Sequence, residues 1–396
     1  MTRRSGYVGR SSVRAQRRAR LRGSSVSLIL ALLSMIALTT SCDSASSGGN
    51  YESTQRSVTV SDSESHTVDG QGTRARFGRP AGLAFDSKGS LYVADAKDYV
   101  IRIVSPEGNV RTFAGSPGHA GHTDGFGSAA RFAIPTGLAI DSHDNLYVAD
   151  SANETIRKVT PDGVVTTYAG LDGRAGVADG DFHTAMFDFP EVIAIGPNDV
   201  LYIISEDSIR EITSDRSVKT VAGMARLPSL SEGERSLDAV ALQAKFSGPG
   251  GLAIDPDSNI YIADSGDMTI RRLDPQGWVR PFAGGFTQPG YQDGPRDTAR
   301  FNQPRAMLLS PDGVLFVSDC HNGRIRRIAT SGLVSSVAAV GCGAGIAMDR
   351  RGLLYVSVGG IQPGSRRPGS ILRISPDGVV STFVGEDSGP PISGRD

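Results

Sequence analysis

Two short apolar segments separated by a polar turn recur six times along the chain. In the clearest copy, residues 137–140 are followed by residues 146–149, and the second segment ends at Asp150. The residues that end this second segment in the six copies, at positions 95, 150, 205, 264, 319 and 358, are spaced by 55, 55, 59, 55 and 39 residues. A recurring unit of this size predicts a repeat architecture, because each unit can bury its faces only against its neighbours.

Each repeat predicts four short β-strands. In the second repeat they are residues 137–140, 146–149, 155–159 and 164–168, which we call strands a, b, c and d. Residues 160–163 between strands c and d read Thr-Pro-Asp-Gly, which is the composition of a type I turn. Strand b is almost continuously apolar, which indicates burial on both of its faces. The sequence therefore predicts an all-β protein, a six-bladed β-propeller of four-stranded antiparallel blades over residues 69–386.

An aspartate that ends strand b and an Ile-Arg pair on strand c recur together. They occur as Asp95 with Arg102, Asp150 with Arg157, Asp264 with Arg271, and Asp319 with Arg326. This pattern resembles the NHL repeat, and the resemblance extends over about residues 74–385. Ser205 and Val358 replace the aspartate in two copies, where Arg210 and Arg373 are expected to continue the arginine row. We interpret both rows as structural, because a pair that repeats in every blade does not by itself make a site.

The first 42 residues have the three parts of an export signal. An arginine-rich stretch ends at Arg22, an apolar stretch spans residues 26–38, and Thr-Thr-Ser precedes Cys42. The small residues before Cys42 resemble a bacterial lipobox, which implies that residues 1–41 are cleaved and that Cys42 is lipidated. Cleavage as an ordinary secretory signal and retention as an anchor are the alternatives. Residues 42–68 are then a tether in which residues 56–60 form either an edge strand or more linker, and residues 387–396 are a tail.

Charge argues against nucleic acid as a partner. The whole chain holds 41 Lys and Arg against 42 Asp and Glu, but eight arginines and no acid lie in its first 42 residues. The remainder carries 33 basic and 42 acidic residues, a net charge of −9. Phosphate backbones are bound by clustered basic residues, which this balance opposes. We expect a membrane contact through the lipid anchor, a protein or small-molecule ligand, and a location on the extracytoplasmic side of a bacterial cell envelope.

A period of 55 residues exceeds the roughly 40 residues that a blade needs. The excess lies between strand d and the next strand a, where an Asp-Gly or Glu-Gly pair is followed by a phenylalanine, as at Asp124 and Phe132. In a propeller the d–a and b–c connections share one face, which we call the loop face. The inserts are therefore expected to build up that face. Only the junction between the fifth and sixth repeats lacks one.

The candidate binding corner lies at this junction. Cys320 and His321 begin the b–c connection of the fifth blade, Cys342 precedes strand a of the sixth, and Arg366 and Arg367 lie in the long b–c connection of the sixth. Because Cys320 and Cys342 fall on the same face of adjacent blades, we predict a disulfide between them. A disulfide that only braces the junction, beside a solvated basic loop, is the alternative interpretation of the same residues.

No constellation of catalytic or metal-binding residues is evident in the sequence. The six histidines are scattered, whereas zinc needs three or four converging ligands, and no G-x-S-x-G, P-loop or H-E-x-x-H motif occurs. We therefore predict neither a metal nor a cofactor. Exported NHL propellers are binding modules, so the resemblance implies binding of a ligand or protein through the loop face. Related propellers include lactonases and an amidating lyase, so a hydrolase or lyase with a site at the central funnel is the alternative.

Overall fold

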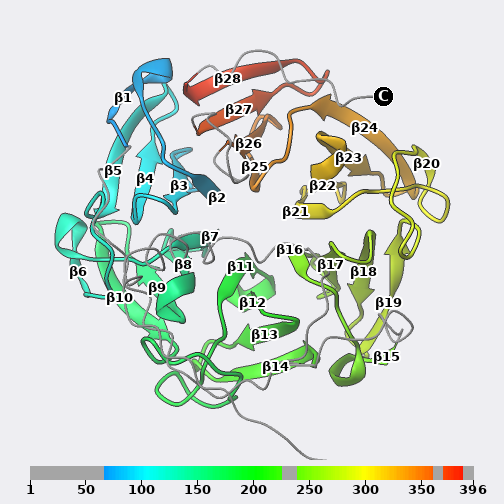
Figure 1. The fold of residues 1–396 in the computed structure, drawn as a ribbon, viewed down its shortest axis with the longest axis horizontal. Helices are drawn as coiled ribbons and strands as arrows, with labels where there is room; N and C mark the ends of the chain where they lie inside the picture. Colours follow the sequence, from blue (N-terminus) through cyan, green and yellow to red (C-terminus); the bar gives the residue numbers. More distant parts are fainter. Residues whose placement is uncertain (1–66, 225–238, 360–368, 387–396) are drawn as a thin grey trace, which may run out of the picture. The chain divides into compact units, whose positions relative to one another are not determined.

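The computed structural model describes residues 67–224, 239–359 and 369–386, which form six antiparallel sheets around a common axis (Figure 1). Each sheet is made from one continuous part of the chain, and its four main strands, a to d, run outward from the axis in chain order. The predicted six-bladed propeller is thereby confirmed. The N-terminal signal, Cys42, residues 56–60, Arg366, Arg367 and the C-terminal tail lie outside the described residues.

The strands of the blades follow the predicted repeat closely. Strands a, nearest the axis, are β2 (Pro80–Phe85), β7 (Pro135–Ile140), β11 (Pro190–Ile195), β16 (Pro249–Ile254), β21 (Pro304–Leu309) and β25 (Gly345–Met348). Strands b are β3 (Leu91–Asp95), β8 (Leu146–Asp150), β12 (Leu201–Ser205), β17 (Ile260–Asp264), β22 (Leu315–Asp319) and β26 (Leu354–Val358). Strands c are β4 (Val100–Val104), β9 (Thr155–Val159), β13 (Ser208–Ile212), β18 (Thr269–Leu273), β23 (Arg324–Ile328) and β27 (Ser370–Ile374). Strands d are β5 (Asn109–Gly115), β10 (Val164–Ala169), β14 (Val218–Gly223), β19 (Trp278–Ala283), β24 (Leu333–Ala339) and β28 (Val380–Gly385).

Strand b is buried on both faces, as its composition predicts. All five residues of β3, β8, β12 and β26 are buried. The strand b tyrosine also packs edge-on against an aromatic residue of strand d in four of the blades, for example Tyr92 against Phe113 with ring centroids 5.1 Å apart. The side chains of each sheet therefore fill the space between neighbouring blades, where the hydrophobic clusters lie.

The innermost strands approach one another so closely that a side chain would not fit at some positions. A Cβ atom on Gly82 of β2 would lie 2.4 Å from the carbonyl oxygen of Thr136 on β7. A Cβ atom on Gly251 of β16 would lie 2.2 Å from the carbonyl oxygen of Arg305 on β21. Glycine in strand a is thus required by contact between blades, which is a common reason for glycine within a strand.

Among the residues that the structure describes, the first and last blades exchange no strand. Phe77 forms an isolated β-bridge with Gly369, and Ser357 Oγ donates a 2.6 Å hydrogen bond to the carbonyl oxygen of Ala81. A shared hydrophobic cluster joins residues of the first blade, such as Leu83, to residues of the sixth, such as Tyr355. In the described part of the chain, the first and last blades are therefore joined by side-chain packing, a β-bridge, a hydrogen bond and the ion pair between Arg76 and Glu386.

The inserts add short elements that the sequence did not predict. Two-residue strands pair with the outer strand d of four blades: β1 (Gly70–Gln71), β6 (Gly125–Phe126), β15 (Ala239–Val240) and β20 (Gly294–Pro295). Single-turn 3₁₀ helices follow three of these strands: η1 (Gly72–Arg74) follows β1, η2 (Gly127–Ala129) follows β6, and η5 (Ala241–Gln243) follows β15. Three further 3₁₀ helices lie outside the inserts, namely η3 (Ser151–Asn153), η4 (Pro197–Asp199) and η6 (Cys320–Asn322).

The inserts also reach beyond the loop face, on which the sequence analysis placed them. Gly127 N donates a 2.9 Å hydrogen bond to the carbonyl oxygen of Gly163, which lies in the c–d turn on the opposite face. Gly72 N makes the equivalent bond to Gly108 O, also at 2.9 Å. The insert therefore runs down the outer rim of the blade and returns, which covers the otherwise unpaired edge of strand d.

Candidate functional site

The strand c arginines are held in fully buried positions. Arg157 donates through Nη1 to Asp150 Oδ2 at 3.0 Å and through Nη2 to Asp124 Oδ1 of the insert at 2.6 Å. Its guanidinium carbon lies 5.3 Å from the centre of the Phe132 ring. Arg157 itself is 0% exposed. The arginine thus connects strand b, strand c and the insert of the same blade.

The same arrangement repeats around the ring. Insert aspartates accept from buried arginines in the pairs Asp69–Arg102, Asp179–Arg210 and Asp293–Arg326, at 2.7, 2.8 and 2.6 Å. Each of the five buried arginines also faces an insert phenylalanine at 5.1 to 5.3 Å: Phe77, Phe132, Phe187, Phe246 and Phe301. The interpretation of the aspartate and arginine rows as structural agrees with this geometry, in which the terminal nitrogens of the guanidinium groups bind within the blade. The Nε atoms of Arg102, Arg157 and Arg210 are buried without a hydrogen-bond partner.

The strand b aspartate also binds the backbone that enters strand a. Asp150 Oδ1 accepts a 2.7 Å hydrogen bond from Ala133 N, and Asp319 Oδ1 accepts one of 2.7 Å from Asn302 N. Burial raises the pKa of Asp150 to about 7, although Arg157 opposes the shift. In blade 3, Ser205 takes this place, since its Oγ accepts from Asp188 N at 2.8 Å.

Blade 6 lacks the buried arginine of strand c, and the sequence analysis assigned the wrong residue to that position. Val356 pairs with Leu372, just as Val93 pairs with Arg102 in blade 1. The prediction that Arg373 continues the arginine row is therefore wrong, because Leu372 occupies the buried position. Blade 6 has an apolar residue at both positions of the pair, Val358 and Leu372, and it is also the blade that no insert precedes.

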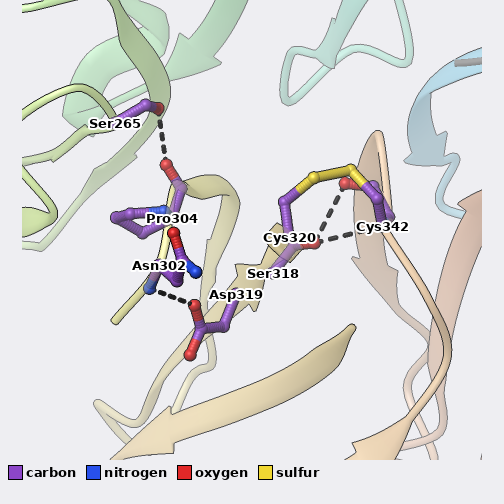
Figure 2. The surroundings of a disulfide bond; sticks show 8 residues. Ser265, Asn302, Pro304, Ser318, Asp319, Cys320 and Cys342 are labelled. Atoms are coloured by element: carbon purple, nitrogen blue, oxygen red, sulfur yellow. Dashed lines mark hydrogen bonds between the residues drawn. A yellow bond between two sulfur atoms is a disulfide. The ribbon is translucent and has the colours of Figure 1, made fainter. Parts of the chain in front are cut away.

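The junction before blade 6 contains a disulfide between Cys320 and Cys342, whose Cα atoms are 4.1 Å apart (Figure 2). Beside it, Ser318 Oγ donates to the carbonyl oxygen of Gly343 at 3.0 Å and accepts from Gly343 N at 3.1 Å. These contacts link strand b of blade 5 to the start of strand a of blade 6. The junction without an insert is therefore held by a covalent bond and by a serine that contacts the next blade.

His321, next to the disulfide, has a backbone hydrogen bond and an imidazole whose pKa is shifted by its surroundings. Its backbone N donates a 3.0 Å hydrogen bond to the carbonyl oxygen of Asn302. Burial lowers the pKa of the imidazole, the positive charge of Arg305 lowers it further, and Asp319 acts in the opposite direction. The imidazole is therefore neutral near pH 7, and Arg305 is one of its electrostatic neighbours. Of the corner predicted from sequence, the structure brings together Cys320, Cys342 and His321.

Arg305 belongs to a group of charged residues that sequence analysis missed. The second residue of strand a differs in each blade: Ala81, Thr136, Glu191, Gly250 and Arg305 in blades 1 to 5. Glu191 of blade 3 interacts electrostatically with Arg305 of blade 5 and with Arg79, which directly precedes β2 of blade 1. Blades 1, 3 and 5 are not neighbours in the ring, so these groups can meet only near its axis. We call Arg79, Glu191, Arg305 and His321 the mouth cluster.

The charged side chains of the mouth cluster act on one another electrostatically: Arg305 and Arg79 favour the charged form of Glu191, and Glu191 favours that of Arg79. Arg79, Glu191 and Arg305 make no side-chain hydrogen bond or ion pair with any residue that the structure describes. Surrounding protein raises the pKa of the Glu191 carboxyl and lowers the pKa of the Arg79 guanidinium, in each case because it withdraws water from the charged form. Glu191 is nevertheless exposed to solvent. The cluster therefore combines accessibility with incomplete hydration, which is typical of functional sites.

A signal for this cluster was present in the sequence. The residues at these positions depart from the repeat, whereas the flanking positions keep Pro on one side and Leu, Ile or Met on the other. A search for charged residues at the second position of strand a, which is uncharged in the other described blades, would have found Glu191 and Arg305. Arg79 would have remained hidden, because it precedes the strand.

Other candidate residues do not converge. His122 Nδ1 lies 2.9 Å from Asp172 Oδ2 on the surface, and His119 Nδ1 lies 2.9 Å from the carbonyl oxygen of Pro117. Within the described ranges, no group of three or more His, Cys, Asp or Glu side chains is arranged to hold a metal ion. The same residues contain no helix long and apolar enough to cross a membrane.

A separate cavity lies between blades 6 and 1, on the face opposite the loop face. Its volume is about 160 Å³, and its lining includes Phe85, Lys88, Arg350, Arg351 and Tyr355. Arg351 is paired with Asp349 at 2.8 Å. The cavity shares no residue with the mouth cluster and is an independent feature of the inter-blade groove.

Comparison with known proteins identifies relatives of the repeat region. Residues 119–329 match the model of the Teneurin NHL domain. Teneurin-3 of Danio rerio is 28% identical over 215 residues, which are 49% of this chain and 8% of that protein. NHL repeat-containing protein 2 of Bos taurus is 33% identical over 162 residues, which are 38% of this chain and 22% of that protein. This chain thus spans less than a quarter of the length of either relative.

Solved structures share the fold. A structural genomics protein of unknown function from Bacteroides thetaiotaomicron superposes with a TM-score of 0.55 at 19% sequence identity, covering 73% of this chain and 69% of that one. At this level of identity the similarity establishes the propeller architecture alone.

Proposed function

The chain belongs to the family of NHL-repeat β-propellers, and we propose that it is a ligand- or protein-binding module that uses its loop face. The observation that carries the proposal is the mouth cluster. Glu191 and Arg305 stand at strand positions that are uncharged in the other described blades, and they converge with Arg79 near the axis. Guanidinium groups donate and carboxylates accept charge-assisted hydrogen bonds, which are strong and directional. Such groups recognise a partner that supplies the missing counterparts.

The proposal places the propeller outside the cytoplasmic membrane. It rests on the arginine-rich and apolar segments of residues 1–41 and on the small residues that precede Cys42. Lipidation of Cys42 would attach the chain to the membrane, and residues 43–68 would leave the loop face free to meet a ligand. The acidic balance of the remaining chain agrees with a partner other than nucleic acid.

A second candidate function, a hydrolase or lyase, is favoured by one observation. The pKa of His321 is lowered in part by the positive charge of Arg305, so a neutral imidazole, which can act as a general base, has a cationic group in its surroundings. A panel of lactone and ester substrates tests this alternative. Turnover that His321→Ala abolishes would support catalysis, and turnover that is unchanged in that variant would place any activity elsewhere.

A ligand screen on the full chain in detergent tests the binding function. The melting temperature is measured against a broad set of small molecules and, separately, against envelope protein fractions. We expect at least one partner whose effect is lost in Glu191→Gln and Arg305→Met. The matched controls are Glu107→Gln and Arg111→Met, because both residues are exposed and neither belongs to the mouth cluster. A partner that all four variants bind equally would contradict binding at the mouth cluster.

A further inference from the structure

The cavity between blades 6 and 1 lies where a contact that joins other blades is incomplete. Five residues connect strand a to strand b in every blade, and at two junctions these turns are linked by the same hydrogen bonds. Asp144, the fourth turn residue of blade 2, accepts from the backbone N of Ser87 in blade 1 at 2.7 Å and from its Oγ at 2.6 Å. Asp199 of blade 3 accepts in the same way from Ser142 of blade 2, at 3.0 and 2.6 Å. Both junctions therefore bind a carboxylate between neighbouring turns.

The junction of blades 6 and 1 has the backbone donor of this contact but not the carboxylate. In blades 3, 4 and 5 the second turn residue is a proline, which has no N–H, and the fourth turn residue of the blade that follows is uncharged: Ser258, Gly313 or Gly352. Donor and carboxylate are thus both present or both absent at the other five junctions. Blade 6 has Arg350 at the second position, and its backbone N has no hydrogen-bond partner among the described residues. Blade 1 has Gly89 at the fourth position, where a carboxylate would meet that donor.

Positive charge lines the place that Gly89 leaves open. Lys88 and Arg350 are exposed and line the cavity, and neither makes a side-chain hydrogen bond or ion pair with a residue that the structure describes. The carboxylate of Asp349 in the cavity wall is bound by Arg351 at 2.8 Å. Asp144, on which Lys88 and Arg350 act electrostatically, is already bound at the next junction. The cavity therefore offers two cations, in a chain that carries a net charge of −9 after its first 42 residues.

The rest of the cavity wall is apolar and contains three aromatic rings. Phe85 and Tyr355 meet edge to face with ring centroids 5.0 Å apart, and Tyr355 and Phe383 meet in the same way at 5.1 Å. The last residue of strand a is aromatic only in blade 1, because the other blades have Ile140, Ile195, Ile254, Leu309 and Met348 there. An apolar cavity of about 150 Å³ accepts one benzene molecule. With a volume of about 160 Å³, this cavity has room for one aromatic ring.

We propose that this cavity binds a small aromatic carboxylate. Its ring lies against the three aromatic side chains, and its carboxylate takes the place that Asp144 and Asp199 occupy at the other two junctions. The backbone N of Arg350 donates as the serine backbone does there, while the Arg350 guanidinium and the Lys88 ammonium group add charge-assisted hydrogen bonds. These opposite charges offset part of the freedom that a ligand loses on binding, a loss that is smaller for a tethered side chain. The site lies on the face opposite the mouth cluster and does not depend on the proposed function.

Isothermal titration of the full chain in detergent tests the ligand class, with benzoate, phenylacetate and 3-phenylpropionate as probes. For the probe that binds best, three analogues are titrated: its primary amide, which has no charge, its cyclohexane counterpart, which has no aromatic ring, and acetate, which has no ring. The amide and acetate should bind roughly ten- to hundredfold more weakly, and the cyclohexane counterpart severalfold more weakly. Any analogue that binds as tightly as the probe would overturn the proposal, as would absence of binding by all three probes. This series needs no variant protein.

A variant that supplies the carboxylate from within the chain tests the location. Gly89→Asp gives blade 1 the aspartate of blades 2 and 3, where Asp144 and Asp199 already adopt positive φ angles of 60° and 57°. Gly89 has a φ of +85°, and an added Cβ would meet only Pro106 Cγ, at 3.9 Å, so there is space for the side chain. The variant should bind the probe roughly tenfold more weakly or worse, because its own carboxylate occupies the site.

Two matched controls separate this effect from strain and from charge. Gly277→Asp adds the same side chain at a φ of +84° in an open turn of blade 4 and should bind the probe as the wild type does. Arg350→Ser gives blade 6 the serine of blades 1 and 2 and should weaken binding, whereas Arg111→Ser, at an exposed arginine outside the cavity, should not. Melting temperatures confirm that each variant is folded. Wild-type affinity in Gly89→Asp or in Arg350→Ser would overturn the proposal, and so would equal weakening in the controls.

Discussion

Replacement of the buried Arg157 tests whether its hydrogen bonds to strand b and to the insert stabilise the blade. In Arg157→Leu the guanidinium that binds Asp150 and Asp124 is lost, and with it the Nη1 hydrogen bond of 2.9 Å to the carbonyl oxygen of Arg131. Asp124 is half exposed and can be hydrated, but Asp150 is fully buried. Removal of one partner of a buried ion pair typically costs about 3–5 kcal/mol, because the other charge is left uncompensated. We expect a loss of this size in the free energy of unfolding.

Blade 6 supplies the design of the second variant. Blade 6 has Val358 and Leu372 where blade 2 has Asp150 and Arg157. The double variant Asp150→Val with Arg157→Leu therefore gives blade 2 the same apolar pair. Replacement of a whole buried ion pair by apolar residues is often close to neutral. Ala133 N would still lose its acceptor, which costs about 1–3 kcal/mol for a buried donor. The double variant should therefore be more stable than Arg157→Leu alone.

Chemical denaturation, followed by circular dichroism, measures the free energy of unfolding of four proteins: the wild type, Arg157→Leu, Asp150→Val and the double variant. The matched control is Arg111→Leu, since Arg111 is an exposed arginine on strand d, and a surface change of this kind usually stays within about 0.5 kcal/mol. The denaturation midpoint should fall clearly for Arg157→Leu and partly recover in the double variant. Two results would refute a stabilising role of the Arg157 hydrogen bonds. One is that Arg157→Leu is no less stable than Arg111→Leu. The other is that the effects of Asp150→Val and Arg157→Leu on the free energy of unfolding simply add.

Three further outcomes follow from the anchor, the disulfide and the mouth cluster. Cys42→Ala should release the protein from the membrane fraction, as followed by immunoblot of fractionated cells; wild-type retention would contradict the lipid anchor. Reduction of the Cys320–Cys342 disulfide, which closes a segment with a sequence separation of 22, should lower stability by about 3 kcal/mol in the chain-entropy model. Intact mass after denaturing alkylation checks the bond itself, and two alkylated thiols at these positions would show that it is absent. The affinity for a partner that donates a hydrogen bond to Glu191 should fall as the pH drops through the Glu191 pKa, which loss of hydration to the surrounding protein raises above the ordinary value of 4.5, because a protonated carboxyl accepts hydrogen bonds less strongly than a carboxylate. Titration at several pH values should show this fall in the wild type and not in Glu191→Gln.

Much of the architecture was determined by neighbouring residues in the sequence. The c–d turn of Thr160 to Gly163 and the apolar run of β8 act over a few residues, so the strands they predict agree with the structure to within one or two positions. The period of the repeat then specified six blades, because each blade is built from one continuous stretch of chain. The absence of an insert before blade 6 could also be read directly from the spacing of 39 residues.

The candidate site was decided only by the tertiary structure. Arg79, Glu191 and Arg305 lie far apart in the sequence, and their proximity depends on closure of the ring, which brings alternate blades together at the axis. The register of β27 likewise decided that Leu372, and not Arg373, faces the blade interior, because a shift of one residue exchanges the two faces of a strand. Local patterns determine which elements form, whereas the meeting of distant side chains depends on how all the blades pack, and no short stretch of sequence contains that information.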